Sequence, residues 1–185
     1  MPVLKFEKEY KSMFNQQIPT TERQIKVIPF FVNPADNNVY IALSRTNNGK
    51  SFTFAGSSVL NYEGSYPSQE DFQNTIHFAS RFNFDRDMDN YWSILCQYLR
   101  FPVYDRREHK YVEKDHHITM CFQLLSMDEV NEIAYKKGEN VLFQTVNVEE
   151  GFNYNPIAQA FLEQNGGEFI NQLIRGIEKN IGKKE

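Results

Sequence analysis

Two basic side chains four residues apart are the first candidates for chemistry in this sequence. His77 and Arg81 lie in a stretch whose apolar residues recur at helical spacing, and residues at i and i+4 are neighbours on a helix surface. A guanidinium with a second nitrogen donor beside it can bind phosphate oxygens without a metal ion. The alternative is that the same pair belongs to a solvated polar face, and both interpretations stay open.

Histidine and cysteine also occur together further along the chain, but their spacing does not predict a metal site. His116 and His117 are adjacent in a segment with strand character, so their side chains should point to opposite faces. Cys121 falls on the same side as His117, yet two ligands do not make a zinc site. No local pattern pairs Cys96 or Cys121 with a histidine for nucleophilic catalysis, and Walker, Rossmann and zinc-ribbon motifs are absent from the sequence.

The stretch that contains His77 predicts a strand, a loop and a helix in succession. Alternation around Phe52 predicts a short strand, and two glycines punctuate the loop that follows. Ser68 and Asp71 form a capping box with Asp in place of the usual Glu, so the helix should begin there. Its apolar stripe, which we expect to be buried, consists of Phe72, Ile76, Ala79 and Phe82. Asn83, a residue type that accepts left-handed backbone geometry, is predicted to end the helix.

Residues 52–84 resemble the central motif of the Nudix family in an eroded form, and the resemblance extends more loosely over residues 25–165. The family's box reads G-x5-E-x7-R-E-U-x-E-E-x-G-U, where U is a bulky apolar residue. Aligning Asn83 with the last Gly puts Phe84 and Phe78 on two of the apolar positions. The Glu and Arg positions of the box are then occupied, in order, by Ser68, Ile76, His77, Ser80 and Arg81. No carboxylate of the box remains in this register.

The resemblance implies what the helix does in active members of the family. Its carboxylates hold divalent metal ions that bridge a pyrophosphate and activate a water molecule. Here the same face would offer His77, Ser80 and Arg81 to a ligand. Arg45 joins this ligand-binding set because family members often carry a basic residue at the end of that strand, near the phosphates. An exposed strand-end arginine without any function is the alternative.

Other acidic residues keep an enzymatic hypothesis open. Glu63 lies in the loop before the helix, and Glu150 follows the last predicted strand, where some Nudix enzymes place a general base. Glu70 and Asp71 are near the first Glu position, but they suit the positive N-terminus of the helix equally well. Glu149 and Glu150 also fit as solvated loop charges. If the protein is an enzyme, we expect Glu63 and Glu150 to be catalytic and Mg²⁺ to be the cofactor.

The remaining elements indicate an α+β fold. They are predicted strands at 24–32, 39–44, 91–104, 117–125 and 141–148, a helix at 126–137 that begins with a second capping box, and two helices beyond residue 155. Pro102 should place its strand at a sheet edge, and the charged residues 105–115 should form a hairpin tip. Together with the resemblance, this order predicts a Nudix-like α/β/α sandwich with a mixed sheet.

Composition restricts the class of protein. A net charge of −4 argues against bulk binding to nucleic acid or to an anionic membrane, and no apolar run is long enough to span a bilayer. The two cysteines lie in apolar runs and are expected to be buried reduced thiols, so we predict a cytoplasmic protein. We expect an N-terminal appendage at residues 1–24, with aromatic residues at helical spacing, and a Nudix-like domain at 25–185.

The missing carboxylates decide the functional prediction. We predict a catalytically degenerate Nudix-fold protein, without a metal or other cofactor, that binds a nucleotide or another phosphorylated ligand. A protein partner, including a second copy of the chain, is an alternative kind of ligand. The alternative function is a divergent Mg²⁺-dependent Nudix hydrolase that cleaves a nucleoside diphosphate linked to another moiety.

Overall fold

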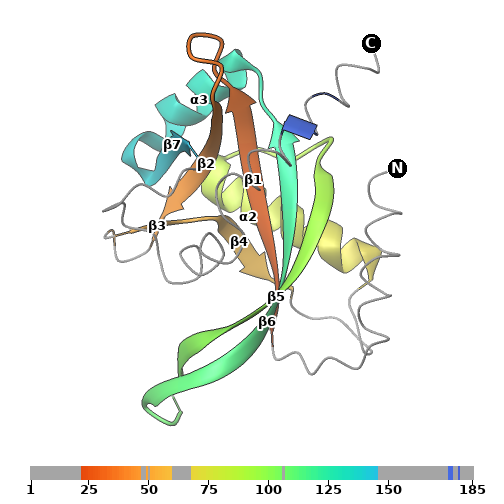
Figure 1. Cartoon of the computed structure of the whole chain (residues 1–185), viewed down its shortest axis with the longest axis vertical. Helices are drawn as coiled ribbons and strands as arrows, with labels where there is room; N and C mark the ends of the chain where they lie inside the picture. The colour runs from red at the N-terminus through yellow and green to blue at the C-terminus, as the bar shows by residue number, and fades with distance from the viewer. Residues whose placement is uncertain are drawn as a thin grey trace.

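The strands of the protein form a single mixed sheet in a computed structural model that describes residues 22–46, 49, 51–59, 68–105, 107–145, 175–176 and 179 (Figure 1). The strands are β1 (Glu22–Val32), β2 (Val39–Arg45), β3 (Phe52–Thr53), β4 (Ala55–Ser58), β5 (Trp92–Asp105), β6 (Lys110–Leu124) and β7 (Val141–Thr145). The main order across the sheet is β3-β2-β1-β6-β5. β1 and β6 run parallel, whereas the other pairs are antiparallel. The predicted α+β class with a mixed sheet is confirmed.

The sheet divides where β2 leaves β1, and this division positions the candidate site. β1 and β2 pair only close to their connecting turn, over Phe30–Val32 and Val39–Ile41. Further along β1, the strand β4 takes the place of β2 as its neighbour. β2 meanwhile pairs with β3 on one side and with β7 on the other. The last residues of β2 are therefore separated from β1 by the chain that joins β3 to β4.

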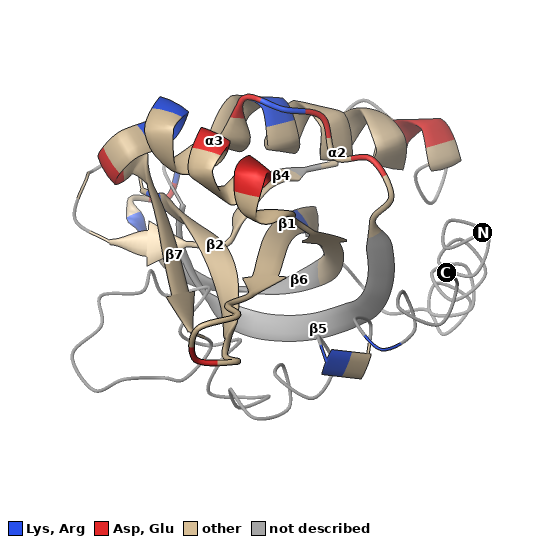
Figure 2. Cartoon of the chain, turned by 90° about the horizontal axis from the view of Figure 1, so that it is seen from above, with Lys and Arg blue, Asp and Glu red and all other residues tan. Residues whose placement is uncertain are grey.

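Two helices cover one face of the sheet, as Figure 2 shows from above. They are α2 (Gln69–Phe84) and α3 (Met127–Lys137), and a 3₁₀ turn, η1 (Gly138–Asn140), follows α3. Both begin at the predicted capping boxes: the side chains of Ser68 and Ser126 accept hydrogen bonds from the backbone N–H groups of Asp71 and Glu129. Each box satisfies helix N–H groups that would otherwise lack a partner, which is why these starts are determined locally.

The C-terminal end of α2 lies two residues beyond the predicted end. Asn83 is within the helix, and Asp85 adopts the left-handed conformation with φ 55°. At about 100° per residue, Phe82 is about 120° around the helix from Ile76, whereas Asn83 is only about 20° from it. Phe82 is accordingly 68% exposed, in contrast to the buried position predicted for it, and Phe84 is buried instead. Phe72, Ile76 and Ala79 are buried as predicted.

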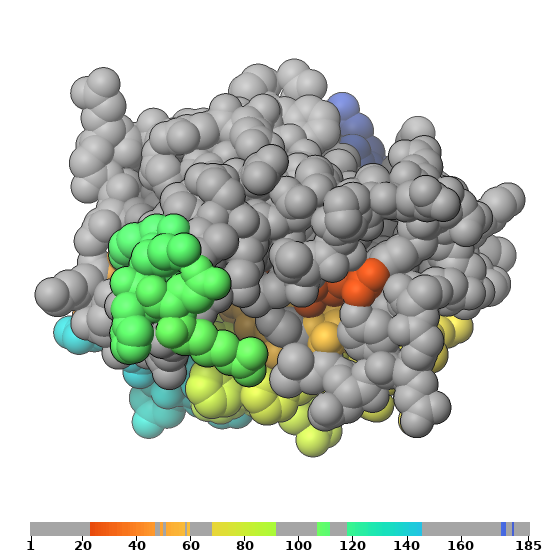
Figure 3. Space-filling view, turned by 90° about the horizontal axis from the view of Figure 1, so that it is seen from below, coloured from red at the N-terminus to blue at the C-terminus, as the bar shows by residue number. Residues whose placement is uncertain are grey.

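β5 and β6 form a hairpin whose turn lies within the predicted range 105–115, but the turn is shorter than predicted because most of that range belongs to the two strands. β5 continues to Asp105 and β6 begins at Lys110, which leaves only a short turn between them. The register places Asp105 opposite Lys110 and Arg100 opposite Asp115. In Figure 3, which views the molecule from below, residues 107–111, which comprise the described part of the turn and the start of β6, are drawn in green. Pro102 lies in β5, at the end of the strand order, as predicted.

Both faces of β1 are buried over its apolar residues. Ile25, Val27 and Phe31 of β1 belong to the cluster that includes the inner faces of α2 and α3. The alternate residues Ile28 and Phe30 are also almost fully buried. Arg175 and Gly176 are helical, and Arg175 Nη2 donates to the Asn37 carbonyl at 2.9 Å. The rest of the two expected C-terminal helices, and the whole predicted N-terminal segment up to residue 21, lie outside the described residues.

Two further predictions concern the cysteines and the absence of a membrane-spanning segment. Cys121 is a buried free thiol, as predicted. Among the helices of the described residues, none combines the length and apolar character needed to cross a membrane.

Candidate functional site

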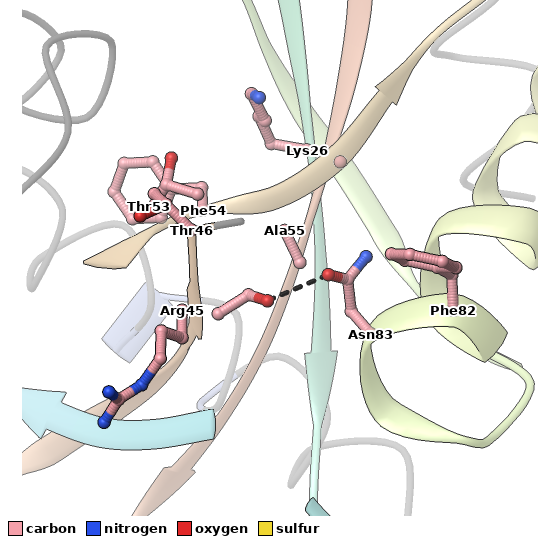
Figure 4. Close-up of a pocket in the computed structure, with 10 residues that line it drawn as sticks. Lys26, Arg45, Thr46, Thr53, Phe54, Ala55, Phe82 and Asn83 are labelled. Carbon is pink, nitrogen blue, oxygen red and sulfur yellow. Dashed lines mark hydrogen bonds between the residues drawn. The ribbon is translucent and has the colours of Figure 1, made fainter. Parts of the chain in front are cut away.

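Two adjoining cavities lie between the end of β2 and the last turn of α2. The strand cavity, of about 290 Å³, is drawn in Figure 4, and the helix cavity measures about 370 Å³. They share the lining residues Ser44, Arg45, Thr46, Phe82 and Asn83. The strand cavity is completed by Lys26, Thr53, Phe54, Ala55 and Gly56, and the helix cavity by Gly49, Lys137 and Asn140. Both sizes are near the lower end of the range for small-molecule sites.

Asn83 connects the helix to the strand at the shared wall. Its Oδ1 accepts a hydrogen bond from Ser44 Oγ at 2.9 Å, and its Nδ2 donates to the Ala79 carbonyl at 2.7 Å. Figure 4 shows Asn83 and Phe82 projecting from α2 and the bond between Asn83 and Ser44 as a dashed line. Because one amide group bonds through both of its ends, its orientation is defined, and the wall is polar.

Arg45 is held mainly by neutral acceptors. Its Nε donates to the Glu139 carbonyl at 2.9 Å and its Nη1 to the Gly49 carbonyl at 3.3 Å, while the guanidinium lies 5.3 Å from the centre of the Phe52 ring. Its Nη2 also forms a long ion pair, 4.0 Å, with Oε2 of the exposed Glu139. The carbonyl oxygens fix the position of the guanidinium, and the exposed Glu139 offsets only part of its charge.

Two lysines add positive charge to the lining. Lys26 is only 8% exposed, although its neighbours in β1 from residue 25 to residue 32 are all apolar. Lys137 Nζ lies 3.4 Å from Asp85 Oδ1 and 3.5 Å from the Phe82 carbonyl, at the C-terminal end of α2. A cation at this end offsets the partial negative charge of the last helix carbonyls. Among the described residues, the lining of the two cavities thus includes three cations and no acid.

His77 and Arg81 lie close together, as predicted, but they contact a carboxylate on the outer side of α2. Arg81 binds Asp87 through both branches of its guanidinium, at 2.5 and 2.9 Å. His77 Nδ1 is 3.3 Å from Asp87 Oδ1. The hydrogen bond from Arg81 lowers the pKa of Asp87, and the same bond raises the pKa of Arg81. A phosphate at this pair would therefore compete with a resident carboxylate.

Ser80 is separate from both the pair and the cavities. It is 1% exposed, and its Oγ donates to the Arg86 carbonyl at 2.6 Å. Of the four residues predicted to bind a ligand, the structure places Arg45 at the cavities, His77 and Arg81 beside Asp87, and Ser80 in the interior.

The later helix end allows a second alignment of the motif, two residues further along. If the left-handed Asp85 is aligned with the last Gly of the box, Phe82 and Asn83 take the paired Glu positions, but the two apolar positions fall on Ser80 and Arg86. The earlier Gly and Glu of the box then fall on Gly64 and Glu70. Sequence reasoning missed Phe82 and Asn83 as lining residues, although an asparagine within an apolar stripe was a usable signal. Lys26, which lies among the apolar residues of β1, was a second signal of the same kind.

The described residues do not fit the magnesium ions of the family. Mg²⁺ in phosphate-binding sites is usually held by one or two carboxylates, together with water and the substrate phosphates. No group of three or more His, Cys, Asp or Glu in the described part of the chain is placed to hold a metal, and the cavity lining lacks carboxylates. Asp71 precedes Asn83 by twelve residues, roughly 18 Å along the helix, and its carboxylate accepts from Ser68. Glu63, Glu149 and Glu150 lie outside the described residues.

Comparison with known proteins identifies similar structures but no similar sequences. No family model matches the chain, and no curated protein does. One similar structure is Shewanella oneidensis NrtR complexed with a 27mer DNA, which is 13% identical with a TM-score of 0.49; the match covers 76% of this chain and 58% of NrtR. C. elegans Ap4A hydrolase is 9% identical with a TM-score of 0.45, and the match covers 86% of this chain and 98% of the hydrolase. A mutT/nudix family protein from Listeria innocua is 10% identical with a TM-score of 0.43, and the match covers 68% of this chain and 79% of that protein.

These are Nudix structures. They belong to the family whose box residues 52–84 resemble. The chain spans little more than half the length of NrtR.

Proposed function

We propose that this chain is a Nudix-like protein that binds a small phosphorylated ligand in the two cavities, without metal-assisted hydrolysis. The observation that carries the proposal is that Lys26, Arg45 and Lys137 line the cavities together, and the described lining residues include no acid. Arg45 and Lys137 also pair with Glu139 and Asp85, which are not among those lining residues. A phosphate group offers several strong acceptors and negative charge to such a surface. The paired Glu positions of the motif hold no acid in either alignment, whether Ser80 and Arg81 or Phe82 and Asn83 occupy them, and this supports the absence of hydrolysis.

Arg45 is the central binding group in this proposal. Its hydrogen bonds to the Glu139 and Gly49 carbonyls occupy two of the five N–H donors of a guanidinium. Because these bonds hold the side chain in place, little conformational freedom is lost when a phosphate binds to the remaining donors. The C-terminal end of α2 is unfavourable for an anion, and Lys137, which pairs there with Asp85 at 3.4 Å, offsets part of the negative charge at this end.

The His77–Arg81 pair is the other place proposed for a phosphate. There the ligand must displace Asp87, which already makes a two-branched contact with Arg81. At Arg45 the ligand instead meets a cation held by neutral carbonyls. The cavities are therefore the favoured location, and the outer face of α2 is the competing one.

Calorimetric titration of the full chain with pyrophosphate in EDTA tests the proposal. We expect binding without metal, and we expect Arg45→Gln to weaken it roughly 10- to 150-fold, the loss typical of a charged hydrogen bond. The matched control, His77→Ala/Arg81→Ala, also removes basic groups but lies outside the cavities, and it should bind as the unmodified chain does. The opposite result would place the ligand on the outer face of α2.

An activity screen separates the proposal from the enzymatic alternative. ADP-ribose and dinucleoside polyphosphates are incubated with the protein and Mg²⁺, and nucleotide release is measured. We expect no release. Turnover that disappears in Glu63→Gln or Glu150→Gln would overturn the loss of hydrolysis and support the divergent hydrolase. If no phosphate compound binds at all, the proposal fails, and a protein partner becomes the hypothesis to test.

A further inference from the structure

The polar wall shared by the two cavities has hydrogen-bonding groups whose roles can be assigned. Asn83 Nδ2 donates to the Ala79 carbonyl at 2.7 Å, and since a carbonyl oxygen only accepts, this bond fixes which end of the amide carries the protons. Oδ1 is then the end that faces Ser44, so the Ser44 hydroxyl donates its proton to it at 2.9 Å (Figure 4). Ser44 Oγ is left with lone pairs, and the second N–H of the Asn83 amide remains for a ligand.

A phosphate alone does not match this wall. Phosphate oxygens at neutral pH are mainly acceptors, and Ser44 Oγ offers them only its own lone pairs. Two facing acceptors do not form a hydrogen bond, so the phosphate belongs at the cations of the helix cavity, Arg45 and Lys137. The part of the ligand beside the wall must then supply a donor. A hydroxyl group both donates and accepts, and it therefore fits Ser44 and Asn83 at once.

An aromatic ring lies beside the wall. Phe82 lines both cavities, and 68% of its surface is exposed. Phe78, one helical turn earlier, stacks on it with the ring centroids 5.9 Å apart and an interplanar angle of 18°, which holds Phe82 in place. A sugar ring has hydroxyl groups around its edge and C–H groups on its faces, and such a face packs against the negative face of an aromatic ring. The lining thus combines cations, a hydroxyl-binding wall and an aromatic surface.

We infer that the ligand of the cavities is a phosphorylated sugar, whose hydroxyl groups bond to the shared wall while its phosphate faces the cations. The inference rests on the proposed function and names the chemical class of its ligand. The cavities, of about 290 and 370 Å³, are near the lower end of the range for small-molecule sites, as suits a single sugar ring with one phosphate. The wall selects for hydroxyl groups, whereas the cations bind the phosphate of any compound.

The test compares glucose 6-phosphate with cyclohexylmethyl phosphate, which has a six-membered ring and the same phosphate group but no hydroxyl groups. Both are titrated into the full chain by calorimetry in EDTA. Each neutral hydrogen bond strengthens binding roughly 2- to 12-fold, so glucose 6-phosphate should bind more tightly by about that factor. Burial of apolar surface on Phe82 alone would favour the other probe, because its ring is the more apolar. The two explanations therefore predict opposite preferences.

Two variants assign the preference to the wall. Ser44→Ala removes the hydroxyl, and Asn83→Leu removes the amide at similar size, so each should abolish the preference for glucose 6-phosphate. Ser44→Ala leaves α2 unchanged and serves alone if Asn83→Leu does not fold. The matched control is Asn74→Leu, because Asn74 is exposed on the same helix and is not among the lining residues of either cavity. It should keep the preference.

The outcomes separate the inference from the proposed function. Equal binding of the two probes, or tighter binding of cyclohexylmethyl phosphate, would overturn the inference while the proposed function stands. A preference that survives Ser44→Ala would overturn it too, because the hydroxyl groups would then be recognised away from the wall. If neither probe binds but pyrophosphate does, only the inference fails. If pyrophosphate does not bind either, the proposed function fails with it.

Discussion

Gly56 and Lys26 face each other where β4 pairs with β1, and their contact leaves no room for a side chain at position 56. A Cβ atom there would lie 2.3 Å from the Ile25 carbonyl oxygen and 2.6 Å from Lys26 Cδ. The lysine stem could move aside, but the backbone oxygen could not do so without separating β4 from β1. A glycine is thus required by close approach of two strands.

Gly56→Ala is therefore expected to lower the free energy of unfolding by about 1–3 kcal/mol, the usual cost of overpacking. Urea denaturation measures this change. Gly176→Ala is the control, because a Cβ atom at that helical position meets nothing within 4 Å. Its stability should be unchanged or slightly raised. Equal stability of Gly56→Ala and the unmodified chain would show that β4 can shift without loss, in contradiction to the close contact.

At the scale of elements, the start of α3 is joined to the chain after α2 by an ion pair. Arg86 Nη2 donates to Glu129 Oε1, while Glu129 Oε2 accepts from the Ser126 backbone N–H at 2.7 Å as part of the capping box. Burial raises the pKa of Glu129, but the hydrogen bonds from Ser126 and Arg86 and the charge of Arg86 outweigh it. The net pKa lies below the ordinary value of 4.5.

The lowered pKa has a defined consequence for stability. A carboxyl whose pKa is lower in the folded state stabilises the fold above its unfolded pKa, and this contribution disappears as the pH falls through the folded value. Glu129→Gln should therefore cost about 1 kcal/mol at neutral pH, because the pair is partly exposed. The difference should shrink below about pH 4.5. Urea unfolding of both proteins between about pH 3 and pH 7 measures it.

Glu132→Gln provides the comparison for this experiment. Glu132 pairs with Lys136 on the surface of the same helix, and that hydrogen bond lowers its pKa as well. Its carboxylate takes no part in the capping box, so we expect a smaller effect than for Glu129. An equal effect at both positions would mean that the contact between Arg86 and the capping residue adds nothing to stability.

The elements that sequence predicted well are those with local causes. The capping boxes at Ser68 and Ser126 placed the starts of α2 and α3, because the bonds involved join residues three apart. The end of α2 was misplaced because Asp85 bonds back to the Arg81 carbonyl and lies beside Lys137 of another helix. The length of β6 was underestimated because pairing with β5, rather than its own apolar pattern, extends it to Lys110.

At the scale of the whole molecule, the candidate site combines residues from separate elements. Lys26 comes from β1, Arg45 from β2, Phe82 from α2 and Lys137 from α3. Arg45 was predicted because it ends a strand near the motif. The others depend on the division of the sheet between β1 and β2 and on the rotation of α2 about its axis. Neither feature can be read from the periodicity of apolar residues, because the exposed Phe78 and Phe82 have the same four-residue spacing as the buried Phe72 and Ile76.

The charge of the molecule and the charge of the site have opposite signs, and this makes a last prediction possible. The net charge of −4 repels a phosphate compound, whereas the lining cations attract it. Screening extends over about 10 Å at 0.1 M salt, so the interaction of a ligand with distant acids is already weakened and the lining cations dominate.

Raising NaCl from about 50 to 500 mM should therefore increase the dissociation constant for pyrophosphate several-fold. Calorimetry in EDTA measures it, and Arg45→Gln should flatten the dependence. Tighter binding at high salt would mean that repulsion by the whole chain governs association, and the cationic cavity would lose its role.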